Sequence, residues 1–280
     1  MKGMLLSPRA GLSLRSKSRR RIFHPSFVPE VAAGYFWEAG NTTGFGTTGF
    51  KVLEGNGHST FDLIQATVAN QPTLLTENGG AQFRMRPTTD GAPAFAVTSG
   101  SVARGWTSAT GIMGWFRIPD AAGVLPASGT VLMQHSGGSG FRGINALANI
   151  NSSTQVLSNA LSGTGSDSNA VRAASPFGGA SWVWVEMFYD PAFVLGGSVA
   201  ADRLKWFVNL TLTPNILPTG TVPASLFNAT TPLAVGCFTT QAPFCTTDWA
   251  SCYYPNGIPS LANRVQLANR ANPTGILLTA

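Results

Sequence analysis

Short strand-like runs dominate the sequence and constrain the fold more than any other feature. The longest spans Ser181 to Tyr189 and is rich in Trp, Val and Phe, and the run Gly111 to Ile118 stops at Pro119. Such runs, rich in β-branched and aromatic residues and bounded by Gly, Pro, Asn or Ser, are typical of antiparallel strands. Further runs of this type lie at residues 94–98, 130–135, 203–209 and 233–238.

No segment after Gly34 shows a helical period of two or more turns, although a short helix or turn fits Asp62–Asn70. Alternation of helices and strands is absent as well. All-β sandwiches of 200–250 residues commonly form one domain, so one sandwich can hold the body of a 280-residue chain. We therefore predict an all-β fold, an antiparallel β-sandwich over residues 34–280.

The basic charge of the chain is concentrated at its N-terminus. Seven of the 18 Lys and Arg residues precede Glu30, the first acid, so 11 basic and 12 acidic residues remain for the rest, a net charge of −1 against +6 for the whole chain. A basic block of this kind commonly acts as an interaction tail. We therefore predict that residues 1–33 form an extended basic N-terminal arm on a neutral body.

The composition of this arm predicts a partner. Pro25 and Pro29 favour an extended course, and so polar a segment buries too little apolar surface to become ordered alone. We favour protein over nucleic acid as the partner, because no aromatics interleave with the basic residues and the body has no excess of basic charge. The predicted partner-binding residues are Arg9, Arg15, Lys17, Arg19, Arg20, Arg21, Phe23 and Phe27.

Targeting signals and cysteines indicate little about where the protein acts or what it binds. Gly3–Leu6 is too short for the apolar core of a signal peptide, while the Arg- and Ser-rich, acid-free start has the composition of an organellar transit peptide. No apolar run reaches the roughly 18–20 residues of a membrane span, so no membrane contact is predicted. Three cysteines, Cys237, Cys245 and Cys252, match no zinc-ligand spacing and form either three thiols or one disulfide and one thiol.

Seven sequence phrases follow one another along the body: Glu54–His58, Gln65–Leu74, Gly79–Phe83, Gly114–Arg117, Trp182–Asp190, Trp206–Asn209 and Thr231–Gly236. Together they resemble the concanavalin A-like (laminin-G-like) domains of phage-encoded proteins. The resemblance covers about residues 50–238 and implies a concanavalin A-like jelly roll. Departures occur at residues 83–87, where the family's FDG-x-x-D is missing, and at Leu210, which stands in place of a glycine.

Catalytic patterns are missing from the sequence. Glucanases of this superfold carry E-x-D-x-x-E on one strand, which sets two carboxylates about 5–5.5 Å apart. The nearest pattern here is Glu186 with Asp190, which we interpret as a solvent-side glutamate and a turn aspartate. No nucleophile elbow, zinc motif, P-loop or dinucleotide fingerprint occurs. We predict no enzyme, no cofactor and no metal site.

Glycan binding is the alternative that the sequence leaves open, because sugar-binding proteins use exposed aromatic and amide side chains. Residues 245–255 are expected to form an aromatic-rich loop, which packs over the sandwich end or against a partner, or binds a sugar. The candidate glycan-binding residues are Trp106, Trp249, Tyr253 and Tyr254.

The leading hypothesis is a structural protein of a bacteriophage virion: a capsid decoration, collar or fibre component, anchored to neighbouring virion subunits by its arm and present as a homo-oligomer or symmetric assembly. The phage-like phrases, the basic arm and the low content of charged residues, 11% of the chain, motivate it. The alternatives are a glycan-binding module for host attachment and, third, a laminarinase-like hydrolase.

Overall fold

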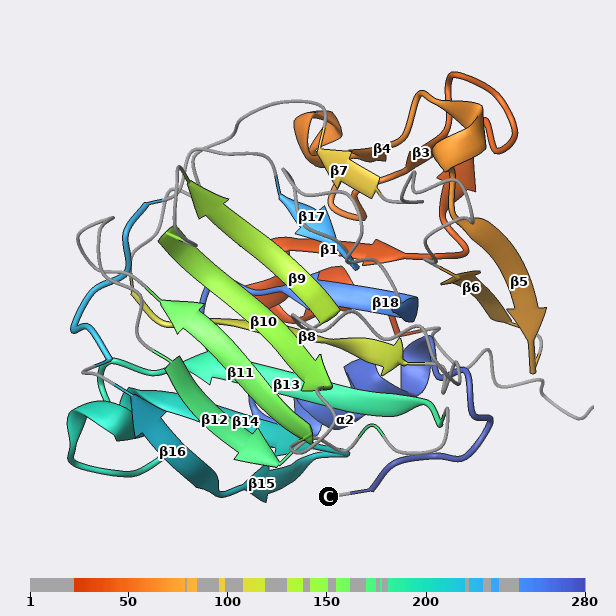
Figure 1. Cartoon of the computed structure of the whole chain (residues 1–280). Helices are drawn as coiled ribbons and strands as arrows, with labels where there is room; N and C mark the ends of the chain where they lie inside the picture. Colours follow the sequence, from red (N-terminus) through yellow and green to blue (C-terminus); the bar gives the residue numbers. More distant parts are fainter. Residues whose placement is uncertain are drawn as a thin grey trace, which may run out of the picture.

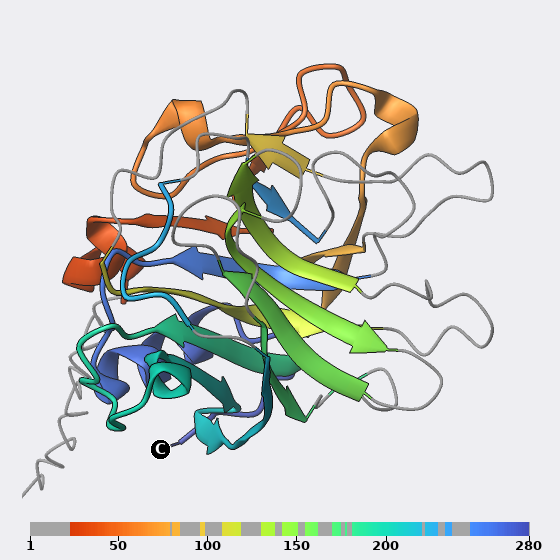
Figure 2. The same cartoon turned by 60° about the vertical axis from the view of Figure 1, so that its left-hand side comes forward.

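The computed structural model is an antiparallel β-sandwich, which confirms the predicted fold class. Two large sheets pack face to face, and α2 lies against the outer face of one of them (Figures 1 and 2). The structure describes residues 23–78, 80–84, 96–98, 108–118, 130–137, 142–150, 155–161, 170–174, 177, 181–219, 222–228, 233–236 and 247–279.

Sheet A is built around β18, a strand from the C-terminal part of the chain. Its other strands come from distant parts of the sequence, and β1 pairs with the second half of β18 while β6 pairs with its first two residues. The order across the sheet is β15 (Thr211–Thr213), β14 (Leu204–Val208), β13 (Val183–Tyr189), β8 (Thr110–Arg117), β18 (Asp248–Tyr254), β6 (Gly80–Arg84) and β5 (Thr73–Glu77), with β1 (Tyr35–Glu38) beside β18.

Sheet B faces sheet A and is drawn in front of it in Figure 1. Its long hairpins, β9–β10 and β10–β11, pair antiparallel. The order is β16 (Asn215–Thr219), β12 (Ala170–Ala174), β11 (Gln155–Leu161), β10 (Arg142–Ile150), β9 (Thr130–Gly137), β17 (Ala234–Val235), β7 (Ala96–Thr98), β4 (Leu63–Ile64), β3 (Lys51–Val52) and β2 (Thr42–Thr43).

The central strands of sheet A, β8, β13 and β18, are buried on both faces, which explains why they have near-continuous apolar sequences. One core fills the space between the sheets and includes Trp37, Trp206 and Trp249. A second core lies between the outer face of sheet A and α2, with Trp115 and Trp184 at its centre. The two cores together stabilise the sandwich and fix the helix on it.

Helices are few, but one of them contradicts the expectation that the body contains no helix of two turns. That helix is α2 (Leu261–Arg270), capped by Ser260. Its apolar stripe is interrupted in the sequence because one buried position is Arg264, so the helical period is obscured. Within Asp62–Asn70 the structure has β4 followed by a short 3₁₀ turn. The other helical segments are α1 (Pro29–Ala32) and the 3₁₀ turns Pro25–Phe27, Ser59–Phe61, Val68–Asn70 and Ala200–Arg203.

The end of the predicted arm belongs to the folded body. An extended course through Pro25 and Pro29 is wrong, because each proline begins a short helical segment, where a missing N–H costs nothing. Val28 and Val31 are fully buried in the second core. The basic residues Arg9, Arg15, Lys17, Arg19, Arg20 and Arg21 lie outside the described residues, so their role stays a prediction.

A buried glutamate organises the loop that carries part of the family resemblance. The carboxylate of Glu54 accepts hydrogen bonds from the backbone N–H of Phe36 at 3.0 Å, of Asn56 at 2.9 Å and of His58 at 3.0 Å. The Asn56 amide in turn donates to the carbonyl of Val31 at 2.9 Å. The loop Glu54–His58 therefore connects the N-terminal segment to the sandwich.

Candidate functional site

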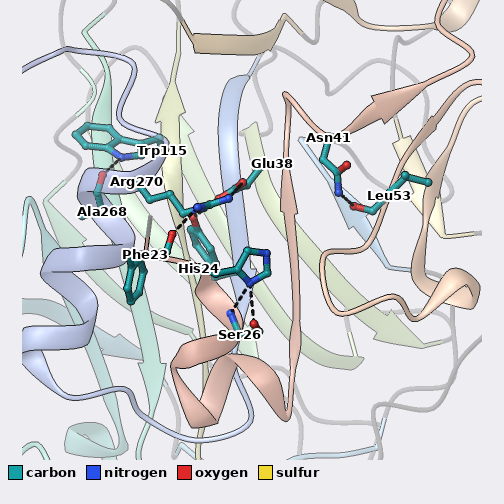
Figure 3. A network of polar contacts seen from close by, with 10 residues as sticks. Phe23, His24, Ser26, Glu38, Asn41, Leu53, Trp115, Ala268 and Arg270 are labelled. Atoms are coloured by element: carbon teal, nitrogen blue, oxygen red, sulfur yellow. Dashed lines mark hydrogen bonds and ion pairs between the residues drawn. The ribbon is translucent and has the colours of Figure 1, made fainter. Parts of the chain in front are cut away.

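A pocket of about 590 Å³ opens beside α2, and we call it the α2 pocket. It lies where the helix, the start of the described chain, the end of β1 and the C-terminal segment meet; Figure 3 shows the polar contacts at its wall. Its lining combines apolar side chains with two amides and one pair of opposite charges: Phe23, Glu38, Val265, Gln266, Asn269, Arg270 and Leu277.

The charged pair is a bidentate contact between α2 and β1. Arg270 Nε lies 2.6 Å from Glu38 Oε1, and Nη2 lies 3.0 Å from Oε2. Arg270 Nη1 also donates to the carbonyl of Phe23, and Tyr253 donates its hydroxyl to Glu38 Oε1 at 3.1 Å. Burial lowers the pKa of Arg270, but the hydrogen bonds to Glu38 and the charges of Glu38 and Tyr253 together outweigh burial and leave that pKa raised. Arg270 therefore stays charged, and its contacts with Glu38 hold it in place.

The two amides of the pocket differ in availability. Asn269 is fully engaged with the C-terminal segment, since its Nδ2 donates to the carbonyl of Leu278 at 2.8 Å and its Oδ1 accepts from the N–H of Leu278 at 2.7 Å. Gln266 is exposed, and among the described residues its amide has no hydrogen-bond partner. Gln266 is therefore the amide that a ligand can reach.

A second ion pair holds α2 on sheet A. Arg264 Nη1 lies 3.1 Å from Glu186 Oε2 on β13, and the Arg264 guanidinium lies 4.3 Å from the ring centre of Phe207. Trp184 Nε1 donates to Glu186 Oε1 at 2.8 Å. Burial raises the pKa of Glu186 to about 7, although Arg264 and Trp184 oppose the shift. This arrangement fixes the helix that forms one wall of the pocket.

The position of Glu186 corrects one interpretation from the sequence. We expected a solvent-side glutamate, but its side chain is fully buried, because α2 covers the outer face of β13. Asp190 is the predicted turn aspartate: its carboxylate accepts from the N–H of Val194 at 2.9 Å and of Leu195 at 2.6 Å. The two carboxylates hold the fold together and do not share an open cleft.

Three of the four predicted glycan-binding aromatics are not on the surface. Trp249, Tyr253 and Tyr254 are each 0% exposed, and they belong to β18, in the interior of sheet A, rather than to a loop. The loop prediction was wrong because it gave more weight to the Gly, Pro and Thr residues around the segment than to the strand-forming residues within it. Trp106 lies outside the described residues.

One of the three cysteines is described. Cys252 is a buried free thiol whose Sγ lies 3.4 Å from Met133 Sδ, and burial raises its thiol pKa well above the ordinary value. A thiol in this state is chemically inert. Cys237 and Cys245 lie outside the described residues.

Phe23 and Phe27, the aromatic residues predicted to reach a partner, differ in their surroundings. Phe23 packs against the second core and lines the α2 pocket. Phe27 is 65% exposed. Sequence reasoning missed Glu38, Gln266 and Arg270, because nothing in their sequence spacing shows that the N-terminal and C-terminal parts of the chain meet.

The described part of the chain contains neither a cluster of metal-ligating side chains nor a helix that could cross a membrane. Among these residues no three His, Cys, Asp or Glu side chains gather closely enough to hold a metal ion. No helix in the described ranges has both the length and the apolar character to cross a membrane.

Comparison with solved structures finds this sandwich in proteins of very different sequence. A sialidase of Trypanosoma rangeli, in complex with sialic acid, matches 84% of the chain with a TM-score of 0.51 and 14% identity, and the match covers 33% of the sialidase. The ligand binding domain of botulinum neurotoxin serotype D, in complex with N-acetylneuraminic acid, matches 86% with a TM-score of 0.53 and 8% identity, covering 53% of that domain. The binding domain of Paraclostridial Mosquitocidal Protein 1 matches 85% with a TM-score of 0.55 and 8% identity, covering 52% of it.

These likenesses concern the fold. The chain spans about a third of the sialidase and about half of each toxin domain. No protein-family profile matches the chain, and no curated protein matches it in sequence. The link to phage proteins therefore stays a prediction.

The sialidase corrects our prediction that the chain is not an enzyme. A similar fold forms part of the sialidase, which is an enzyme. The absence of the glucanase carboxylates from this sequence therefore does not exclude enzymatic activity. What the comparisons show is the fold: this chain is an antiparallel β-sandwich, similar to a segment of a sialidase and to parts of the two binding domains.

Proposed function

We propose that this chain is a glycan-binding domain. The observation that carries the proposal is the fold, since two proteins that share it over 84% and 86% of this chain are in complex with sialic acid and N-acetylneuraminic acid. A shared fold does not fix a function, so the proposal also draws on the site.

The α2 pocket has the lining that small ligands need. Binding pockets of about 300–1,000 Å³ are mostly apolar, with a few placed polar groups that orient the ligand. The α2 pocket falls within that range, with Phe23, Val265 and Leu277 as its apolar wall and Gln266 and Arg270 among its polar groups. Its place at the edge of a fixed helix keeps these groups in position.

A glycan array tests the proposal directly. The full chain is labelled at a low ratio of label to protein and applied to an array that carries neutral and sialylated glycans. The binding measurement is then repeated in the presence of 0.5 M salt. We expect at least one glycan class to retain the protein at both salt concentrations, because exposed charge contacts alone weaken as salt screens them. An array with no salt-resistant binding contradicts the proposal.

The arm supports a second candidate, a component of a bacteriophage virion. Phe27 is 65% exposed just after the basic segment, so it is available to a neighbouring subunit in a head, collar or fibre. Deleting residues 2–22 is expected to abolish incorporation into particles and leave the body folded. Full occupancy of particles by the truncated protein contradicts this role.

A further inference from the structure

We infer that the α2 pocket binds a neutral pyranose ring through two adjacent hydroxyl groups and discriminates against acidic sugars. The inference rests on the proposed glycan-binding function and adds the site and the ligand class. It follows from the charge balance of the pocket, from the hydrogen-bonding groups that remain available there, and from the apolar wall beside them.

The charges of the pocket cancel. Among its lining residues Arg270 and Glu38 are the charged ones, and their atoms lie 2.6 Å and 3.0 Å apart in two parallel contacts. A ligand carboxylate that approaches Arg270 also approaches Glu38, so the attraction to one is offset by repulsion from the other. An acidic sugar therefore gains little from this arginine, whereas a neutral hydroxyl has no such repulsion to overcome.

The remaining hydrogen-bonding capacity suits hydroxyl groups. A guanidinium has five N–H donors, and Arg270 uses Nε, Nη1 and Nη2 once each, on Glu38 and on the Phe23 carbonyl. One N–H on each of Nη1 and Nη2 remains. Glu38 Oε2 accepts one bond from Arg270 and keeps room for another. A hydroxyl both donates and accepts, so two neighbouring hydroxyls match this donor–acceptor pair.

Gln266 and the apolar wall complete the site. The Gln266 amide, exposed on α2, offers a donor and an acceptor to a further ring hydroxyl. Phe23, Val265 and Leu277 provide the surface against which the C–H face of a sugar ring packs. Asn269 takes no part, because Leu278 engages both ends of its amide.

Isothermal titration calorimetry of the full chain tests the inference. The probes are methyl α-D-glucopyranoside, methyl β-D-galactopyranoside, methyl α-D-mannopyranoside and N-acetylneuraminic acid. We expect one of the neutral glycosides to bind at least tenfold more tightly than the acidic sugar. Gln266→Ala should weaken that binding by about tenfold, the effect of one lost hydrogen bond.

Asn263→Ala is the matched control, since it removes an amide from the same helix outside the pocket lining, and binding should stay within twofold of the wild type. Gln266→Ala is expected to fold, because the position is exposed and Ala is a strong helix former. Equal or tighter binding of N-acetylneuraminic acid, or unchanged affinity of Gln266→Ala, overturns the inference and leaves glycan binding intact. An array without bound glycan instead removes the proposed function itself.

Discussion

At the scale of single residues, two arginine–glutamate pairs connect α2 to sheet A, and they have different surroundings. Arg264 and Glu186 are both buried, whereas Arg270 and Glu38 stand at the edge of the pocket, with side chains 22% and 16% exposed. A buried pair must overcome the cost of removing both charges from water. The inner pair should therefore respond to pH, while the outer pair remains available to a ligand.

The raised pKa of Glu186 predicts a stability that falls as pH rises. Unfolded, this carboxyl titrates near 4.5, and folded it titrates near 7, so the native state holds more protons between those values. Each unit of that difference is worth about 1.4 kcal/mol of unfolding free energy. Stability from this group is complete below pH 4.5 and declines up to about pH 7.

Glu186→Gln should remove this decline, because the amide keeps the acceptor for Trp184 and cannot ionise. We expect the melting temperature of the variant to rise relative to the wild type between pH 5 and pH 8 in thermal denaturation. A temperature difference that is constant or reversed over this range contradicts the assignment.

Buried aromatics of β18 should act on stability rather than on ligand recognition. Trp249→Ala is expected to lower the free energy of unfolding by about 3–5 kcal/mol, the usual cost of emptying a core site of this size. Leu212→Ala, at a half-exposed position, is the control and should change it by less than about 0.5 kcal/mol. Urea denaturation measures both. A change below 1 kcal/mol for Trp249→Ala contradicts its placement in the core.

The sequence phrases that resemble concanavalin A-like domains contain residues that stabilise the fold rather than residues that line the α2 pocket. Glu54 gathers three backbone N–H groups, and Gln71 donates to the carbonyl of Gln65 at 3.0 Å and accepts from the N–H of Gly46 at 2.9 Å. These contacts show that the phrases stabilise loops of the sandwich. They also explain why the same phrases do not reveal the pocket, whose residues come from elsewhere.

At the scale of elements, the strands with long apolar runs were predictable, whereas β18 and the helix α2 were not. The runs at residues 181–189 and 203–209 predicted β13 and β14, because a run of apolar and β-branched residues directly indicates a buried strand. Arg264 occupies a buried position of α2, and a charged side chain can be buried there because Glu186 lies beneath it and pairs with it. Long-range pairing of this kind is invisible to local periodicity.

The packing of α2 gives a test at this scale. Leu267→Ala removes a fully buried side chain from the second core and should cost about 2–5 kcal/mol of unfolding free energy. Leu261→Ala, 46% exposed at the start of the same helix, should cost far less. Chemical denaturation of both variants measures the difference. Equal costs contradict the placement of α2 on sheet A.

At the scale of the whole molecule, a neutral sandwich is joined to a basic N-terminal segment. Deleting residues 2–22 removes seven basic residues and no acid, which changes the formal net charge from +6 to −1. The truncated protein should lose retention on a cation-exchange column while its melting temperature stays nearly unchanged, because so polar a segment adds little to a packed core. A clearly lower melting temperature contradicts this separation of roles.

We propose above all that this β-sandwich binds a sugar in the α2 pocket. The most direct test of this proposal is a crystal structure of the full chain with the tightest-binding methyl pyranoside from the calorimetry. We expect a sugar ring against Phe23, with hydroxyl groups within hydrogen-bond distance of Arg270, Glu38 and Gln266. A sugar bound at another place on the sandwich, with the α2 pocket empty, contradicts it.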